Sequence, residues 1–415
     1  MEDHSIQPLL TGPLPGTGGR YKAHESDFQV EELPLYPFSG QGTHHYFYVE
    51  KQGLTTQDTL NILGHQLGIR TQDIGYAGLK DAKAVTRQWL SIEHIDPQRV
   101  LNLNCPNIRI LQHTQHQNKI KLGHLSGNHF KIRIRDLGCP LMQAMDRARE
   151  ILNWIQTKGC PNFFGPQRFG KRHNAHLLGQ AILRDDRETF FSILLGQPTT
   201  GESAACIEAR VLYEKGDYPK AHDMWPHSFS EERRLLSRFM KFDGNINRTF
   251  RCISKNIKRF YVSAYQSHIF NLVLMKRLSS FDRLLEGDIA YKHENGACFP
   301  VHDASTEQPR CDRFEISPTG PIFGPQMKSA FGPAGQIENP ILIHELNSLL
   351  EHPEKLRKES AKGGRRPLRI QPKNTSIATG QDDYGQYLEL IFDLPSGSYA
   401  TVLLHEIMKS SEHDH

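Results

Sequence analysis

The chain has 415 residues, of which 37% are hydrophobic and 23% are charged, and its formal net charge is +4. This length is too great for one ordinary core and predicts two domains, while the composition excludes a largely disordered chain. The net charge is too small to indicate a nucleic-acid-binding protein by itself, so local clusters of cations must carry that argument.

The cysteines and the N-terminus limit the class of protein further. The seven cysteines are scattered without a CxxC pair, and no HExxH motif occurs. A disulfide framework and a zinc site are therefore not expected, and we predict that no metal is bound. The first residues, MEDHSIQPLL, lack a basic region followed by an apolar run, and no apolar stretch has the length of a membrane span. We expect a soluble, cytoplasmic protein.

The first part of the chain predicts two strands and a helix after an extended lead-in, rich in Pro and Gly, over residues 1–19. Phe28 and Val30 fall on one face of a strand predicted for FQVEE, and THHYFYVEK predicts a second strand. Thr55–Leu67 predicts a helix, because a Thr pair begins it, leucines recur at helical spacing and Gly68 can end it.

The next stretch, Ile74–Ile92, has apolar ends and a polar centre. That centre holds one glycine, one carboxylate and three cations, namely Gly78, Asp81, Lys80, Lys83 and Arg87. A lone carboxylate among cations is expected to have a lowered pKa and to stay ionised, which suits a nucleophile or a charge stabiliser better than a proton donor. A loop with a surface ion pair is the alternative interpretation.

The segment Pro97–Arg135 contains seven Lys and Arg residues and no Asp or Glu. Its second half, Lys119–Arg135, predicts two strands around a Gly-containing connection. Lys131, Arg133 and Arg135 alternate there with apolar residues, so strand geometry puts the cations on one face. That face is either a solvated outer surface of the sheet or a surface that follows the phosphates of a nucleic acid.

Leu141–Lys158 predicts an amphipathic helix, which Gly159 can end. The following NFFGPQRFG combines three aromatic residues and two glycines with Arg168, and a buried turn is one interpretation of it. Beyond it the pattern becomes less regular, with Tyr261–Leu278 as the clearest helix.

Two segments near the C-terminus complete the predicted elements. Lys355–Arg369 carries seven Lys and Arg residues and a Gly pair, which predicts an exposed loop or hinge. The segment YLELIFDLPSGSYATVLLHEI predicts an alternating strand, a turn and a helix.

Six blocks of this sequence together resemble the tRNA pseudouridine synthase D (TruD) family. They are, in chain order, YKAHESDFQVEE, YAGLKDAKAVTRQWLSI, LGHLSGNHFKIRIR, PNFFGPQRFG, SAYQSHIFN and LPSGSYATVLLHEI. The resemblance implies an isomerase that converts uridine to pseudouridine at position 13 in the D arm of tRNA and needs no cofactor. Such a reaction agrees with the lack of a phosphate-binding loop and of a dinucleotide fingerprint.

The resemblance also implies the fold. We expect an α+β protein whose pseudouridine synthase catalytic domain has a mixed, mostly antiparallel sheet and comprises residues 1–159 and 369–415. An inserted, family-specific α/β domain is expected over residues 160–368, with RNA held between the two domains.

Carried over by position, Asp81 resembles the catalytic aspartate of the family, and Lys22 resembles a lysine of the active site. Asn128 and Phe130 resemble the residues that hold and stack the target base, and Tyr399 stands where other members have an aromatic residue. We also expect Lys80, beside the aspartate, to belong to the active site. Six cations are candidates for RNA binding, namely Lys83, Arg87, Lys131, Arg133, Arg135 and Arg168.

The sequence leaves several points open. The carboxylate could add to uracil C6, attack ribose C1′, or take a proton from the sugar. A non-catalytic tRNA-binding or tRNA-folding factor is the alternative function, and a hydrolase is weakly supported because no GxSxG motif or paired acidic motif occurs. We expect tRNA as the partner, no protein partner and a monomer.

Overall fold

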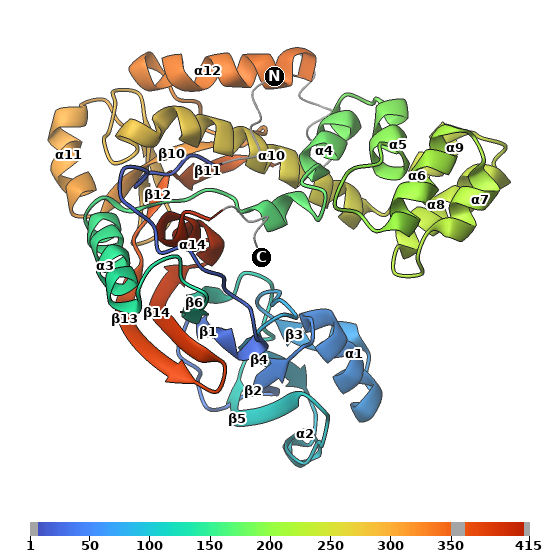
Figure 1. Cartoon of the computed structure of the whole chain (residues 1–415), viewed down its shortest axis with the longest axis horizontal. Coiled ribbons are helices and arrows are strands. Elements are labelled where there is room, and N and C mark those ends of the chain that lie inside the picture. The colour runs from blue at the N-terminus through green and yellow to red at the C-terminus, as the bar shows by residue number, and fades with distance from the viewer. Residues whose placement is uncertain (1–6, 350–361, 411–415) are drawn as a thin grey trace. The chain divides into compact units, whose positions relative to one another are not determined.

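The computed structural model of the protein describes residues 7–349 and 362–410 (Figure 1). These residues form two compact units. The sheet unit comprises residues 8–162 and 369–410, and the helical unit comprises residues 163–349 and 362–368 together with Gln7. That the helical unit is the inserted domain expected over residues 160–368 stays a prediction.

The sheet unit is built on an eight-stranded sheet, counted over the described residues, in the order β13-β14-β6-β1-β4-β2-β5 with β3 beside β4. In sequence order the strands are β1 (Phe28–Pro34), β2 (His44–Gln52), β3 (Gly75–Tyr76), β4 (Val85–Glu93), β5 (Ile108–His116), β6 (Leu125–Ile134), β13 (Lys373–Asp382) and β14 (Gly385–Pro395). The central pair β1–β4 runs parallel and its neighbours in the sheet run antiparallel. This confirms the predicted α+β fold with a mixed, mostly antiparallel sheet.

Helices and one short strand pair complete the sheet unit. They are η1 (Glu25–Asp27), α1 (Thr56–Leu67), η2 (Thr71–Asp73), α2 (Pro97–Leu101), α3 (Leu141–Lys158), α14 (Ala400–Met408), and the strands β7 (Cys160–Pro161) and β12 (Arg369–Ile370). The predicted helices are confirmed. Thr55 caps α1 by accepting a hydrogen bond from the Asp58 backbone, and Gly68 ends it with φ 70°, a left-handed conformation that glycine adopts readily.

Helices pack against the sheet in two places. Helix α1 packs against β2 and β4 through an apolar cluster that includes Phe47, Leu63 and Leu90. Helix α3 contacts β13, β14 and α14, as Figure 1 shows. Alternate residues of β6, such as Ile132 and Ile134, are buried, so strand periodicity fixes which side chains face the core.

Two predicted elements differ from the structure. Lys119–Arg135 contains one strand, β6, rather than two, because its first half makes loop contacts: the Gly123 N–H donates to the Ala77 carbonyl at 2.8 Å. The loop predicted for Lys355–Arg369 is wrong at Gly364–Pro367, which forms β11, where Arg365 is buried in an ion pair with Glu338. Residues 355–361 of that prediction lie outside the described residues.

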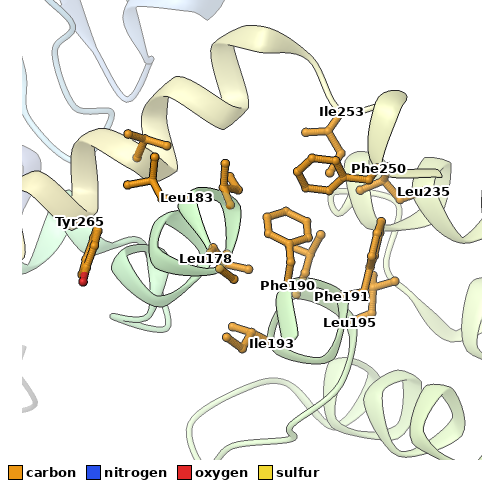
Figure 2. Close-up of a cluster of buried hydrophobic side chains, with 14 of the residues drawn as sticks. Leu178, Leu183, Phe190, Phe191, Ile193, Leu195, Leu235, Phe250, Ile253 and Tyr265 are labelled. Atoms are coloured by element: carbon orange, nitrogen blue, oxygen red, sulfur yellow. The ribbon is translucent and has the colours of Figure 1, made fainter. Parts of the chain in front are cut away.

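The helical unit contains a small sheet in the order β11-β10-β8-β9. Its elements are η3 (Pro166–Phe169), α4 (Ala175–Leu183), α5 (Arg187–Leu195), α6 (Ala204–Glu214), α7 (Tyr218–Met224), α8 (Ser230–Lys241), α9 (Ile246–Arg251), α10 (Lys255–Arg277), η4 (Leu278–Ser280), β8 (Ile289–Lys292), β9 (Cys298–Pro300), α11 (Ala304–Asp312), β10 (Ile316–Ile322), α12 (Gly332–Leu346), η5 (Asn347–Leu349) and β11 (Gly364–Pro367). Figure 2 shows part of its core, where Phe190 of α5 meets Phe250 of α9 at 5.3 Å between ring centroids. No helix within residues 7–349 and 362–410 is long and apolar enough to cross a membrane.

Candidate active site

The candidate catalytic carboxylate lies on the loop that connects β3 to β4. The side chain of Asp81 is 53% exposed, and its Oδ2 accepts a hydrogen bond from Lys22 Nζ at 3.2 Å. The Lys22 ammonium also lies 4.4 Å from the centre of the Phe28 ring. Lys22 has φ 60°, a left-handed backbone conformation that is uncommon for a lysine and concentrates at functional sites. The structure thus brings together the two residues that the resemblance placed in one site.

Buried polar side chains of the sheet unit bond the backbone of this loop. Lys51 of β2 donates to the backbone carbonyls of Leu54 and Asp81, the latter at 3.0 Å. Thr56 of α1 accepts from the Lys80 backbone N–H at 2.8 Å. These contacts hold the backbone on both sides of Asp81, so the Cα from which the carboxylate extends is fixed without a substrate.

A third contact extends the support to the start of the loop. Gln88 of β4 donates to the Gly78 carbonyl at 3.3 Å and accepts from the Thr56 hydroxyl at 2.9 Å. Both Thr56 and Gln88 are buried, so the contacts are shielded from water. Three elements of the sheet unit, β2, α1 and β4, therefore contribute to the placement of the loop that carries Asp81.

Lys51 was not among the residues predicted from the sequence. A signal was available, since strand alternation places this lysine in phase with the buried Phe47 and Val49. Burial lowers the pKa of Lys51 to about 8, although the nearby Asp81 acts in the opposite direction. A buried lysine whose pKa is shifted by desolvation, beside a candidate catalytic carboxylate, is therefore a further candidate for the site.

A second buried cluster lies beside the loop. Lys80 Nζ donates to Asn128 Oδ1 and lies 3.6 Å from Glu32 Oε2. Burial raises the pKa of Glu32 and lowers the pKa of Lys80, against the attraction between the two charges. The bond from Lys80 directs the Asn128 amide oxygen inward and leaves its NH₂ group as a donor for a ligand. Glu32 was missed in the sequence, where it falls in phase with the buried Phe28 and Val30.

The aromatic candidates lie in different surroundings. Phe130 is only 6% exposed, because its ring stacks on Phe392 at 5.3 Å and meets the edge of Phe28 at 6.2 Å. Tyr399 is half-buried at the residue before α14. The packing of Phe130 gives it a role in the core, and its role in base stacking stays a prediction.

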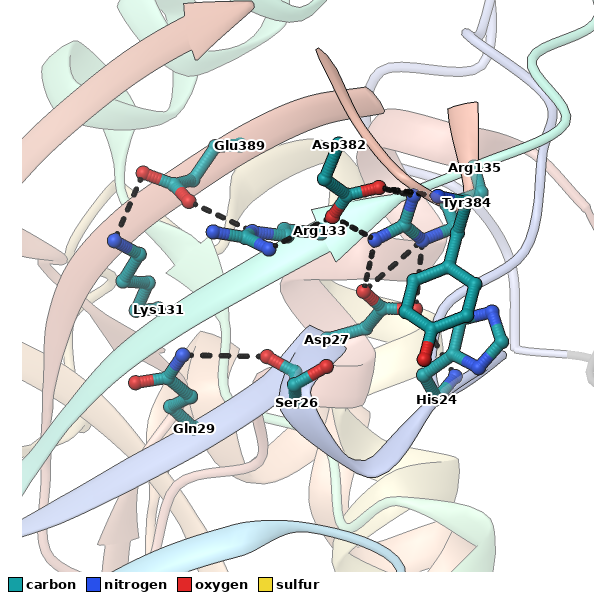
Figure 3. A network of polar contacts seen from close by, with 10 residues as sticks. All are labelled: His24, Ser26, Asp27, Gln29, Lys131, Arg133, Arg135, Asp382, Tyr384 and Glu389. Carbon is teal, nitrogen blue, oxygen red and sulfur yellow. Dashed lines mark hydrogen bonds and ion pairs between the residues drawn. The ribbon is translucent and has the colours of Figure 1, made fainter. Parts of the chain in front are cut away.

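The RNA-binding candidates Lys131 and Arg133 of β6, and Arg135 just after it, have acidic neighbours (Figure 3). Arg135 lies 2.7 Å from both Asp27 and Asp382, while Arg133 bonds Glu389 at 3.0 Å and Lys131 lies 3.3 Å from Glu389. Such pairing makes these cations less available to phosphates. Their role in RNA binding remains a prediction.

The remaining cation candidates differ in exposure. Arg87 pairs with Glu31 and with Glu50, the latter at 2.8 Å, whereas Lys83 is exposed. Arg168 belongs to the helical unit, where it donates to Ser267 Oγ at 3.2 Å and lies 5.7 Å from the centre of the Phe260 ring. The role of these three residues in RNA binding also stays a prediction.

Taken by itself, the site offers an exposed carboxylate, an adjacent ammonium group and an amide donor on a buried polar support. A carboxylate in this setting can act as a nucleophile or as a general base.

Comparisons with known proteins cover nearly the whole chain. The family model for tRNA pseudouridine synthase D (TruD) matches residues 7–407. The chain is 41% identical to tRNA pseudouridine synthase D of Geotalea daltonii over 98% of this chain and 100% of that protein, and 43% identical to that of Syntrophotalea carbinolica over 97% and 98%. A solved structure from Methanosarcina mazei, assigned to tRNA pseudouridine synthase D, is similar with a TM-score of 0.81 and 27% identity over 99% of this chain and 98% of that one. This likeness confirms the expected pseudouridine synthase fold.

Proposed function

The chain belongs to the tRNA pseudouridine synthase D family, and we propose that it converts uridine 13 in the D arm of tRNA to pseudouridine. It is thus an isomerase of the pseudouridine synthase class. In this proposal Asp81 is the catalytic carboxylate. The observation that carries the assignment to Asp81 is its geometry. Its carboxylate is accessible, lies 3.2 Å from the Lys22 ammonium and stands on a loop whose backbone is held by buried side chains.

In this proposal the carboxylate acts on a uridine that has left the base stack. The reaction breaks the N-glycosidic bond, turns the uracil and forms a C–C bond, without oxidation or an energy source. Asp81 serves as nucleophile or base in it, and the three routes through uracil C6, ribose C1′ or a sugar proton stay open. Lys22 attracts and orients the carboxylate through their hydrogen bond.

We propose that the amide of Asn128 recognises the uracil base. With its oxygen bound by Lys80, its NH₂ group can donate to a carbonyl on the edge of the uracil. The buried Glu32 and Lys80 support the amide from the core side. We propose that Tyr399 and Phe130 contact the faces of the flipped base.

A direct test compares Asp81→Asn with the wild type on unmodified tRNA. The substitution keeps the size of the side chain and removes its charge, so we expect the rate of pseudouridine formation to fall at least about a thousandfold, with tRNA affinity unchanged within a few-fold. Asp73→Asn is the matched control, because Asp73 is an exposed carboxylate paired with Arg70 outside the site. Tight tRNA binding without any pseudouridine formed by the wild type would instead support the non-catalytic binding factor.

Phe130 packs in the core and is also proposed to contact the base, so its two roles need a separate test. Phe130→Leu keeps most of the volume in the core and removes the aromatic face, so its isomerisation rate should fall by up to about tenfold with a small loss of stability. Phe392→Leu is the control within the same aromatic stack. An equal rate for both variants would remove base stacking from the role of Phe130.

A further inference from the structure

Two large apolar side chains are exposed on neighbouring loops of the sheet unit. Leu79 is 71% exposed and stands two residues before Asp81, and Leu122 is 67% exposed. The loops are joined by the hydrogen bond from the Gly123 N–H to the Ala77 carbonyl, 2.8 Å long. A single exposed leucine needs no explanation, but two on adjoining loops beside a candidate catalytic residue call for one.

The exposure of Leu79 follows from how the loop is held. Gln88 bonds the carbonyl of Gly78, immediately before Leu79, and Thr56 accepts from the N–H of Lys80, immediately after it. An apolar cluster that includes Leu125 lies close by, since a Cβ built on Gly78 would lie 3.7 Å from Leu125 Cδ1. The leucine nevertheless points outward, because the backbone on both of its sides is fixed.

The surroundings of these leucines match the requirements of a base-flipping enzyme. When one base leaves the stack, an apolar side chain can enter the vacated space and limit the loss of stacking. Lys83 and Lys121 are exposed on the same two loops and carry the charge that attracts phosphates. An apolar tip flanked by cations therefore fits RNA better than it fits another apolar surface.

We infer that Leu79, assisted by Leu122, is a wedge that enters the base stack of the substrate RNA at the place the target uridine leaves. This inference rests on the proposed function, since it requires a nucleotide that turns out of the base stack toward Asp81. Leu79 is a positioning residue: it holds the RNA in the flipped state and takes no part in the bond changes.

The test uses the full chain with tRNA under single-turnover conditions. Leu79→Ala should slow pseudouridine formation on the order of tenfold, whereas Leu79→Met, which keeps a long apolar side chain, should stay within about threefold of the wild type. Met142→Ala is the control, because Met142 is 59% exposed on α3 and should leave the rate unchanged. Melting temperatures should not change, since none of these side chains is buried.

A second measurement reports the flipping step directly. A tRNA with 2-aminopurine next to the target uridine should become brighter on binding Asp81→Asn, as the neighbouring stack opens, and less so on binding Leu79→Ala/Asp81→Asn. Equal brightening for both proteins, or equal rates for Leu79→Ala and the wild type, would overturn the wedge. Absence of pseudouridine with the wild type would instead count against the proposed function, and the fluorescence would still decide whether Leu79 opens the stack.

Discussion

Two clusters of charged side chains in the sheet unit have pKa values that are shifted by different causes. Beside the Asp81 loop, burial lowers the pKa of Lys51 to about 8, lowers the pKa of Lys80 and raises that of Glu32. In the cluster of Figure 3, hydrogen bonds raise the pKa of Arg135, and the bond from Arg135 lowers the pKa of Asp382 to about 2. Desolvation dominates the first cluster, and pairing dominates the second.

This difference suggests a test of which cluster serves activity and which serves stability. Where a charge meets bidentate partners, as Arg135 meets Asp27 and Asp382, the charged forms are favoured and the cluster stabilises the fold. Where burial opposes the charged form, as it does for Lys51, Lys80 and Glu32, the cluster is kept at some expense of stability, which is common at active sites. The comparison therefore predicts that damage to the second cluster affects folding, whereas damage to the first affects activity.

The largest effect is expected for Arg135→Met. Arg135 and Asp27 are both almost fully buried, so the substitution leaves a buried carboxylate without its cation and should lower the free energy of unfolding by about 3–5 kcal/mol. Arg133→Met is the control, since its pairs are partly exposed and should contribute less than about 1 kcal/mol. Urea unfolding measures both. Similar losses for the two variants would show that burial does not distinguish these pairs.

The second prediction concerns Lys51→Met. Loss of the bonds to the Asp81 loop should slow isomerisation about 10–100-fold by misplacing the carboxylate, while stability changes little because a costly buried charge is also removed. Lys409→Met is the matched control: burial lowers the pKa of Lys409 too, but its ammonium bonds Thr11 instead of the Asp81 loop. If both variants keep the wild-type rate, Lys51 is not a positioning residue.

A smaller effect of Lys51 is expected on how the free energy of unfolding changes with pH. The pKa of Lys51 is about 8 in the folded state and near 10.5 when unfolded, so between these pH values the unfolded chain binds more protons. The contribution of Lys51 to stability should then rise with pH from about 8 to 10.5, by at most ~1.4 kcal/mol per pH unit, and be flat below 8. Urea unfolding of wild type and Lys51→Met across this range measures the difference. If the contribution of Lys51 to stability fell as the pH rose, this prediction would be wrong.

Residue patterns predict individual strands and helices, whereas the fold was expected from the family resemblance, and the site residues stay predictions. Strand alternation and helix caps depend on neighbouring residues, so FQVEE and Thr55–Leu67 were identified correctly. The carboxylate partners of β6 come from β13 and β14, about 250 positions away, and no local pattern shows which acids will face Arg133. Lys51 and Glu32 were missed because charged residues on strands are usually exposed, and only their phase with buried neighbours indicates otherwise.

The last prediction uses RNA binding to compare paired with exposed cations. Each phosphate contact that a cation makes adds somewhat under one unit to the slope of log affinity against log salt concentration. Lys131 already lies 3.3 Å from Glu389, so a phosphate must compete with a carboxylate, whereas Lys83 is exposed two residues from Asp81. We therefore expect Lys83→Gln to weaken tRNA binding and flatten its salt dependence, and Lys131→Gln to give a line nearly parallel to that of the wild type. Neither variant should change which uridine is modified, because phosphate contacts position the RNA and contacts to the base carry the specificity. A flattened line for Lys131→Gln alone would mean that RNA binds the paired face, and that the ion pairs of β6 open when it does.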